Sequence, residues 1–309
     1  MATADPIPAE QSRAVAAIGA FDGIHRGHQA LLTSMAARAR ALGGRSVCIT
    51  FDPDPEQVLR PDQAPPALCS TAERARLVQA LGVDETYVWP FTLAVAQMAP
   101  EEFVAALCDR YPLVEVWVGA NFGFGRGRSG TVETLAELGT KYGFRVQIVP
   151  PVIDGDRPIS ATRIRGLLAS GEVREAARLL GRYYRLENEV VGGAQRGRQL
   201  GFPTANLLPP PGRALPAPGV YAGRAHLDDR EYAAVANVGS RPTFGEEQPL
   251  IEVHLLDFAG DIYGRRLAFD FVARVRPVQR FGSLDELRTQ IGRDIDRSRE
   301  LVGLSPPSP

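Results

Sequence analysis

The pattern of apolar residues changes once along this chain, near the segment Arg182-Tyr-Tyr-Arg185. Before it, short apolar runs alternate with helical stretches, whereas after it short alternating segments are separated by glycine and proline. The first pattern predicts parallel strands joined by helical crossovers, and the second predicts a small antiparallel barrel. A chain of 309 residues with both patterns is expected to form two domains, residues 1–182 and 183–309.

The first half is expected to fold as an α/β, doubly wound parallel sheet. Apolar runs predict strands at 15–19, 46–51, 85–89, 114–118 and 145–149. Helical periodicity predicts helices at 27–42, 71–81, 101–110 and 131–142, followed by two short helices within 160–181. Sheets of this kind bind ligands at the carboxyl ends of their strands, so functional residues are expected there.

The second half is expected to fold as a small antiparallel β-barrel domain with a C-terminal helix. Its predicted strands are 186–191, 220–227, 232–238, 250–256 and 266–275. The segment Ser283-Leu-Asp-Glu286 has the spacing of a capping box, which predicts the start of the closing helix.

Composition excludes several classes of protein. The net charge is -1 and the sequence pI is about 6.5. A protein that binds nucleic acid or an anionic membrane usually has a strongly basic surface, and this composition does not indicate one. No apolar run approaches the roughly 18 residues of a membrane span, and the first residues do not resemble a secretory signal. Cys48, Cys69 and Cys108 lack metal-ligand spacing and are expected to be reduced thiols. We therefore expect a cytoplasmic protein, and a homo-oligomer stays open.

The scarcity of lysine restricts how phosphate can be bound. Lys141 is the only lysine, so the chain cannot contain the Gly-Lys pair of a P-loop. Any phosphate must then be held by arginines, by backbone amides at helix starts, or by hydroxyls together with a metal ion.

The octet Phe21-Asp-Gly-Ile-His-Arg-Gly-His28 follows the first predicted strand and opens a helix. Gly23 and Gly27 allow a ligand to approach the backbone, and free N–H groups at the helix start attract an anion. His25 and His28, three residues apart, would project to one side and could donate hydrogen bonds to phosphates. The octet therefore predicts a nucleotide site.

Three other segments end strands or open helices: Thr50-Phe-Asp-Pro-Asp-Pro55, Val118-Gly-Ala-Asn-Phe-Gly-Phe-Gly125 and Ile159-Ser-Ala-Thr-Arg-Ile-Arg165. With the octet, they resemble the HxGH-type nucleotidyltransferase superfamily and, within it, the bacterial flavin adenylyltransferases. The resemblance implies that His28 is catalytic. It also implies that ATP is bound by Phe21, Gly23, His25, His28, Asn121, Ser160, Thr162 and Arg163.

Two positions depart from that family's pattern. Asp54 stands where relatives usually have histidine, and Ala161 replaces the second serine of their ISSTxIR motif. A carboxylate beside a triphosphate adds repulsion unless a metal ion or arginine compensates. Asp54 is therefore either a loop residue that starts a turn or a sign of weakened adenylyl transfer.

The second set of motifs lies in the predicted barrel. The glycine-rich stretch 192–201 runs directly into Phe202-Pro-Thr-Ala-Asn206, and the combined GRxxGFPTAN pattern resembles riboflavin kinase. The resemblance implies that Thr204 and Asn206 are the metal ligands for Mg²⁺, because hydroxyl and amide oxygens suit this ion. It also implies that Mg²⁺–ATP is bound by Gly197, Arg198, Gly201, Thr204 and Asn206.

The catalytic base implied by the same resemblance is Glu252. It lies in Ile251-Glu-Val-His-Leu-Leu-Asp-Phe258, and Asn237-Val-Gly-Ser-Arg-Pro-Thr-Phe244 is a further matching segment. In an alternating strand Glu252 and His254 share one face, and the carboxylate would accept the proton of a ribityl hydroxyl. Three other polar residues are interpreted as ordinary barrel positions: Asp257, Tyr263 and Arg276.

Together, the two motif sets resemble the bifunctional bacterial riboflavin kinase and FAD synthetase family. The resemblance implies ATP-dependent phosphorylation of riboflavin to FMN, then adenylylation of FMN to FAD with release of pyrophosphate. ATP, riboflavin and FMN are the implied ligands, with Mg²⁺ accompanying ATP. Two alternatives stay open: a riboflavin kinase whose first module is inactive because of Asp54 and Ala161, and a non-catalytic protein that binds flavin or nucleotide.

Overall fold

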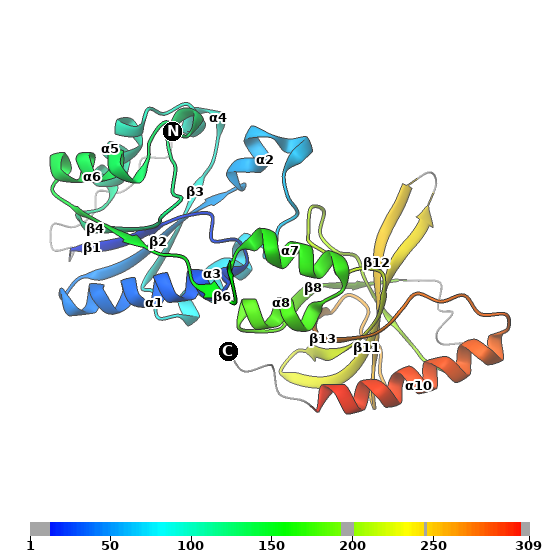
Figure 1. The fold of residues 1–309 in the computed structure, drawn as a ribbon. Coiled ribbons are helices and arrows are strands. Elements are labelled where there is room, and N and C mark those ends of the chain that lie inside the picture. The colour runs from blue at the N-terminus through cyan, green and yellow to red at the C-terminus, as the bar shows by residue number, and fades with distance from the viewer. Residues whose placement is uncertain (1–12, 193–200, 244–245, 304–309) are drawn as a thin grey trace. The chain divides into compact units, whose positions relative to one another are not determined.

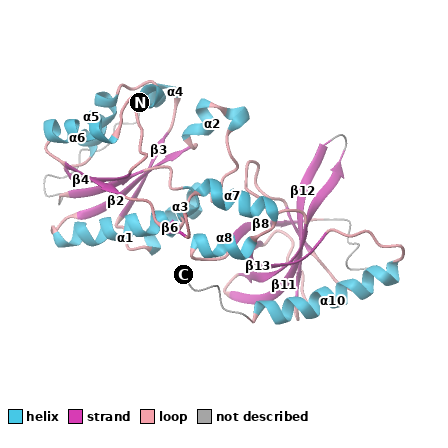
Figure 2. Cartoon of the chain, in the orientation of Figure 1, coloured by secondary structure: helices cyan, strands magenta, loops and turns pink. Residues whose placement is uncertain are grey.

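A computed structural model describes residues 13–192, 201–243 and 246–303. The chain divides into two compact units, Met1–Ser160 and Ala161–Pro309, and each is described by itself (Figure 1). The first unit contains a parallel sheet between helices, and the second contains a barrel together with helices (Figure 2). The predicted fold class, a doubly wound α/β domain followed by an antiparallel barrel and a C-terminal helix, is confirmed.

The sheet of the first unit has five strands, all parallel, in the order β3-β2-β1-β4-β5. Their bounds are β1 (Ala14–Ile18), β2 (Arg45–Asp52), β3 (Glu85–Pro90), β4 (Leu113–Gly119) and β5 (Arg145–Val149). The strand order reverses between β1 and β4. An α/β sheet of this type binds its ligand at the carboxyl ends of the strands beside such a switch point.

Helices cover both faces of this sheet. One core contains residues of α1 (Arg26–Ala41) and α3 (Thr71–Ala80) packed on Val15 and Ala17. The opposite core contains residues of α5 (Pro100–Arg110) and α6 (Val132–Tyr142) packed on Ala14, Ala16 and Ile18. The remaining small elements are η1 (Asp22–Ile24), α2 (Pro55–Leu59), η2 (Pro61–Gln63), α4 (Leu93–Ala96), η3 (Arg126–Arg128), β6 (Ile153–Asp154) and β7 (Arg157–Pro158).

The second unit is a closed antiparallel barrel with strand order β10-β11-β12-β9-β8-β13. Its strands are β8 (Tyr184–Val191), β9 (Ala205–Leu207), β10 (Gly219–Leu227), β11 (Arg230–Thr243), β12 (Glu246–Leu255) and β13 (Arg266–Pro277). Helix α10 (Leu284–Val302) packs on the outside, where Leu301 contacts Ala222, Val272 and Ala273. Its cap is the predicted Ser283, whose hydroxyl accepts the N–H of Glu286 at 3.2 Å.

Two helices precede the barrel, α7 (Ala161–Ser170) and α8 (Val173–Leu180). Helix α8 contacts strands β13 and β8, and five of its eight residues are buried. For this reason the second compact unit begins at Ala161, whereas the predicted division at 182/183 marks where the strand pattern changes. Within the parts of the chain that the structure describes, no helix is long and apolar enough to cross a membrane.

Candidate active sites

The chain makes an unusual turn at the carboxyl end of β1. Phe21, Gly23 and Ile24 all have positive φ angles, of 50°, 75° and 40°, which only glycine adopts readily. Hydrogen bonds from the segment just before α3 hold this turn in place. The buried carboxylate of Asp22 accepts the N–H of Leu68 at 2.9 Å, and the N–H of Gly23 donates to Cys69 Sγ at 3.1 Å. The turn is therefore fastened to a second segment of the unit.

His25 and His28 lie together at the start of α1. Their rings stack with centroids 3.6 Å apart, as their spacing suggests, and the Phe21 ring meets His28 edge-on at 5.2 Å. His25 is the N-cap residue, and its Nδ1 accepts the backbone N–H of His28 at 3.3 Å. Since Nδ1 is the acceptor, a neutral His25 carries its proton on Nε2. The Nε2–H of a neutral His25 is therefore a hydrogen-bond donor.

His28 is held in its neutral form. Burial lowers its pKa well below the ordinary 6.5, and the nearby charges of His25 and Arg74 lower it further. Its Nδ1 is buried and has no hydrogen-bond partner among the described residues. At pH 7 the neutral His28 imidazole can donate or accept a hydrogen bond without carrying a charge.

The other predicted segments of the first unit lie at the same edge of the sheet, because β1, β2 and β4 are parallel neighbours. Asp54 follows β2 and caps α2, its carboxylate accepting the N–H of Glu56 at 3.1 Å. Asn121 is exposed after β4, and its carbonyl accepts from Arg128 at 3.1 Å. The helix-capping role of Asp54 matches the interpretation of this residue as the start of a turn.

The segment 159–165 begins beside the histidine turn. A Cβ atom added to Gly27 would lie 3.8 Å from the carbonyl oxygen of Ile159 and 3.2 Å from the His25 ring. Ser160 is the last residue of the first unit, whereas Ala161, Thr162 and Arg163 form the first turn of α7 in the second unit. That Ser160, Thr162 and Arg163 bind the same nucleotide as His28 stays a prediction.

In the barrel, three polar residues occupy one row across neighbouring strands. Glu252 on β12 pairs in register with Asn237 on β11 and with Asn206 on β9, and residues directly opposite share a face of the sheet. The Asn237 amide donates to the Glu252 carboxylate at 3.2 Å. Asn206 is 4% exposed, and its Oδ1 has no hydrogen-bond partner among the described residues. The row therefore offers a carboxylate and an unused amide oxygen.

His254 anchors the segment that carries Thr204. Its Nδ1 donates to the carbonyl of Pro203 at 2.7 Å, and its ring meets that of Phe202 at 5.9 Å. The sequence places His254 on the face of Glu252, but its bond to Pro203 depends on the fold. Of the kinase residues predicted from sequence, Gly197 and Arg198 lie outside the described residues, and Gly201 adopts a positive φ of 89° just before this segment.

Two cavities meet at Thr204. One of about 470 Å³ contains Glu252 and Asn237 on a largely apolar lining, and the other of about 520 Å³ extends along the segment after β12. The first is lined by Phe202, Thr204, Val220, Val235, Asn237, Glu252, His254, Arg276, Val278, Gln279, Phe281, Leu287, Ile291, Asp294 and Ile295. The second is lined by Pro203, Thr204, Ala205, Val253, Leu255, Phe258, Ala259, Gly260, Asp261, Ile262 and Tyr263.

Two residues interpreted from sequence as ordinary barrel positions line these cavities. Tyr263 is part of the second cavity, and Arg276 is part of the first. Arg276 pairs with the buried carboxylate of Asp294 on α10 at 2.8 Å, which ties the helix to the cavity wall. Asp257, in contrast, pairs with Arg299 near the other end of α10. Only the tertiary structure reveals the first two positions, because no motif marks them.

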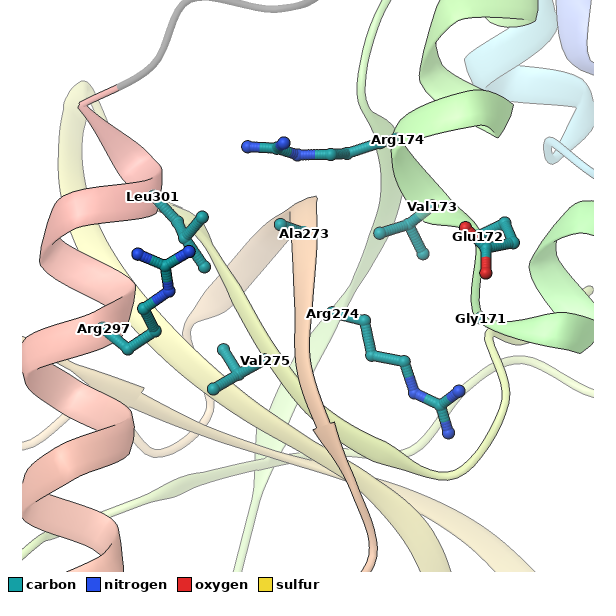
Figure 3. Close-up of a pocket in the computed structure, with 9 residues that line it drawn as sticks. All are labelled: Gly171, Glu172, Val173, Arg174, Ala273, Arg274, Val275, Arg297 and Leu301. Carbon is teal, nitrogen blue, oxygen red and sulfur yellow. The ribbon is translucent and has the colours of Figure 1, made fainter.

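A third cavity, of about 340 Å³, lies between the start of α8, strand β13 and the end of α10 (Figure 3). Arg174, Arg274 and Arg297 line it, but the guanidinium group of Arg274 points away from the other two (Figure 3). Arg274 donates to the carbonyls of Pro218 and Ser170, and Arg297 pairs with Glu300. Of the site residues predicted from sequence that the structure describes, none lines this cavity.

Comparison with protein families settles the relationship. A family model described as FAD synthetase matches residues 7–163, and one described as riboflavin kinase matches residues 180–302. A bifunctional riboflavin kinase/FMN adenylyltransferase from Pseudomonas fluorescens is 40% identical over 299 residues, covering 96% of this chain and 95% of the relative. The chain belongs to the family of bifunctional riboflavin kinases/FMN adenylyltransferases.

Other members of the family are similar over most of their length. The Escherichia coli K12 enzyme of the same description is 37% identical and covers 97% of this chain and 96% of its own. The Bacillus subtilis 168 enzyme is 34% identical, covering 93% and 92%. A solved structure described as a macrolide-efflux protein from Streptococcus pneumoniae has a TM-score of 0.86 and 34% identity, covering 95% of each chain. The bifunctional kinase/adenylyltransferase fold thus extends over both units of this chain.

Proposed function

We propose that this chain catalyses both reactions of its family. The barrel unit transfers the γ-phosphoryl group of ATP to riboflavin and releases ADP, and the N-terminal unit joins the AMP portion of a second ATP to the FMN phosphate. The observation that carries the first reaction is the position of Thr204 between two cavities, one of which contains Glu252. A phosphoryl donor and its acceptor could meet there, and phosphoryl transfer depends mainly on positioning and charge neutralisation.

The cavity that contains Glu252 is suited to the flavin. Its apolar lining, which includes Val235, Phe281 and Ile291, matches an aromatic ring system. The Glu252 carboxylate, oriented by Asn237, takes the proton from the ribityl hydroxyl as that oxygen attacks the γ-phosphorus. The bond from this phosphorus to the ADP oxygen then breaks. The second cavity, with Tyr263 on its wall, takes ATP.

The residues of the barrel also fit a divalent metal ion. The buried Oδ1 of Asn206, which has no hydrogen-bond partner among the described residues, and the hydroxyl of Thr204 are hard oxygen donors of the kind that Mg²⁺ prefers. These two residues would hold the ion, which would neutralise charge on the ATP phosphates during transfer. Gly197, Arg198 and Gly201 would cover the same phosphates.

In the first unit, the histidine pair stabilises the phosphates of the second ATP. A phosphate oxygen of FMN attacks the α-phosphorus, and pyrophosphate leaves. The Nε2–H of His25 and the neutral imidazole of His28 can hydrogen-bond the phosphate oxygens as charge develops. Phe21, Gly23 and Asn121 shape this end of the sheet, and Ser160, Thr162 and Arg163 are the further proposed contacts. No covalent enzyme intermediate is needed.

Chromatography of the flavins formed from riboflavin, ATP and Mg²⁺ by the purified full-length chain tests this proposal. We expect FMN to appear first and FAD to follow. FMN without FAD would support the alternative of an inactive first unit, and unchanged riboflavin would contradict the proposal for both units.

A further inference from the structure

Arg74, on α3, is an unusual buried cation. It is 3% exposed, and among the described residues it is the only arginine or lysine in the protein interior. Among the described residues, three of the four buried carboxylates, Glu115, Asp270 and Asp294, each pair with an arginine. The fourth, Asp22, accepts backbone N–H groups. Arg74 forms no ion pair within the described part of the chain, and its Nε has no hydrogen-bond partner there. Burying a charge without a counter-ion is destabilising, so this arginine is not explained by stability alone.

The guanidinium group of Arg74 connects the ends of two strands. Its Nη1 donates to the hydroxyl of Thr50 at 2.7 Å and to the carbonyl of Phe51 at 3.1 Å, both near the end of β2. The Thr50 hydroxyl in turn donates to the carbonyl of Ala20 at 3.0 Å. Ala20 directly precedes Phe21, the first residue of the turn with positive φ. Arg74 therefore acts, through Thr50, on the turn that carries the two histidines.

This connection supplements the contacts made by Leu68 and Cys69. Those two residues hold Asp22 and Gly23 inside the turn, whereas the Arg74–Thr50 pair holds the carbonyl before it. A turn with non-glycine residues at positive φ persists only where its surroundings fix it. The segment 68–74 thus fixes the turn on both sides, and only Arg74 brings a permanent positive charge.

The charge of Arg74 also reaches the histidines. Together with burial and with His25, it lowers the pKa of His28. A fixed cation beside this turn would attract the triphosphate of ATP without competing with His25 and His28 for direct contact.

We propose that Arg74 is a positioning residue for adenylyl transfer, which sets the Phe21–His28 turn through Thr50 and supplies buried positive charge to the nucleotide site. The proposal rests on the proposed function of the first unit. It assigns a role to a residue outside every motif, and it predicts that the charge is needed for ATP rather than for folding.

The test compares the full-length variants Arg74→Met and Arg74→Lys with the unchanged protein. FAD formation from supplied FMN is measured at varied ATP and varied FMN. For Arg74→Met we expect kcat/KM for ATP to fall by about 10- to 100-fold, the loss typical of misplaced phosphate contacts, while KM for FMN changes less than about twofold. Arg74→Lys keeps the charge and a donor for Thr50, so we expect it to restore most of the activity.

Three measurements separate this role from a structural one. FMN formation from riboflavin by the same preparation reports the second unit. Fluorescence of Trp89 and Trp117, both in the first unit, reports its folding. Arg76→Met, at an exposed position two residues along α3, is the matched control. We expect all three to show normal behaviour, with Arg74→Met unfolding no earlier than the unchanged protein.

Two results would overturn the proposal. One is an Arg74→Met variant with normal KM for ATP and normal FAD formation. The other is a loss of FAD formation that Lys does not restore and that accompanies early unfolding of the first unit. If the unchanged protein makes no FAD, the proposed function of the first unit fails, and the role of Arg74 fails with it.

Discussion

The histidine turn and the face of β12 present their functional groups in different ways. His28 lies at the start of α1 beside a second imidazole, after three residues with positive φ, in surroundings that lower its pKa. Glu252 lies in a regular strand, partly exposed, and is placed by its register with Asn237 and Asn206. The first site depends on an uncommon backbone turn that neighbouring segments hold, and the second depends on ordinary strand pairing.

This difference implies that the two sites will respond differently to substitution. Removing a side chain from a regular strand leaves the backbone in place, so the effect should be confined to chemistry. Changing a histidine of the turn itself removes ring packing that helps to fix the backbone. We therefore expect effects on stability mainly in the first unit.

The largest expected effect comes from Glu252→Ala. Loss of the base should lower FMN formation by about 10²- to 10⁴-fold, while FAD formation from supplied FMN and the thermal midpoint stay unchanged. Steady-state assays of both reactions check this, with Glu231→Gln, an exposed glutamate on β11, as the control. Surviving FMN formation would show that another group is the base.

His28→Asn should have the opposite selectivity and affect the reaction of the first unit. Removing the imidazole should lower FAD formation by about 10²-fold, because a phosphate contact made during transfer is lost. It also removes the stacking on His25 and the edge contact with Phe21, so we expect a lower midpoint in the Trp89 and Trp117 fluorescence transition. FMN formation from riboflavin should stay normal, and a parallel loss there would contradict separate sites.

Acidification should also distinguish the units. His28 has a lowered pKa in the folded chain, so below about pH 6.5 the unfolded chain binds a proton that the folded chain does not. The stability contributed by neutral His28 is therefore present above about pH 6.5 and is lost toward the folded pKa, by up to about 1.4 kcal/mol per pH unit. Denaturant unfolding followed by tryptophan fluorescence at pH 7.5 and 5.5 should show a steeper loss in the unchanged protein than in His28→Asn. Equal losses would contradict a neutral His28.

The smallest effect is expected from Asp54→Ala. The Asp54 carboxylate caps α2, and losing such a cap typically costs about 1 kcal/mol. FAD formation should stay within about threefold of normal, which steady-state assays can resolve. A tenfold change in either direction would show that Asp54 belongs to the nucleotide site rather than to the helix cap.

Much of the fold follows from the sequence. The predicted strands of the parallel sheet lie within one residue of β1 to β5. For β1, β2 and β4, which are largely buried, the reason is that a buried strand must be a short apolar run between turn residues. The prediction of the barrel is less complete. It does not include β9, which has only three residues, and it ends β11 too early and begins β12 too late, because these strands continue through polar residues that lack alternation. Short or polar strands are fixed by their partners rather than by their own pattern.

The motifs marked the histidine turn and the Thr204–Asn206 segment, because these residues are close in sequence. Tyr263 and Arg276 were not recognised, since distant segments form the cavities that they line. One feature of the sequence could have pointed to Arg74. It lies four residues before Val78, on the buried face of α3, where an arginine is rarely found without a partner.

The claim that two separate sites in one chain act in sequence has a direct test. Purified Glu252→Ala and His28→Asn are each incubated with riboflavin, ATP and Mg²⁺, alone and mixed, and the flavins are separated by chromatography. We predict unchanged riboflavin from the first, FMN from the second and FAD only from the mixture, because FMN released by one variant is the substrate of the other. FAD from either variant alone at the rate of the unchanged protein, or none from the mixture, would contradict the claim.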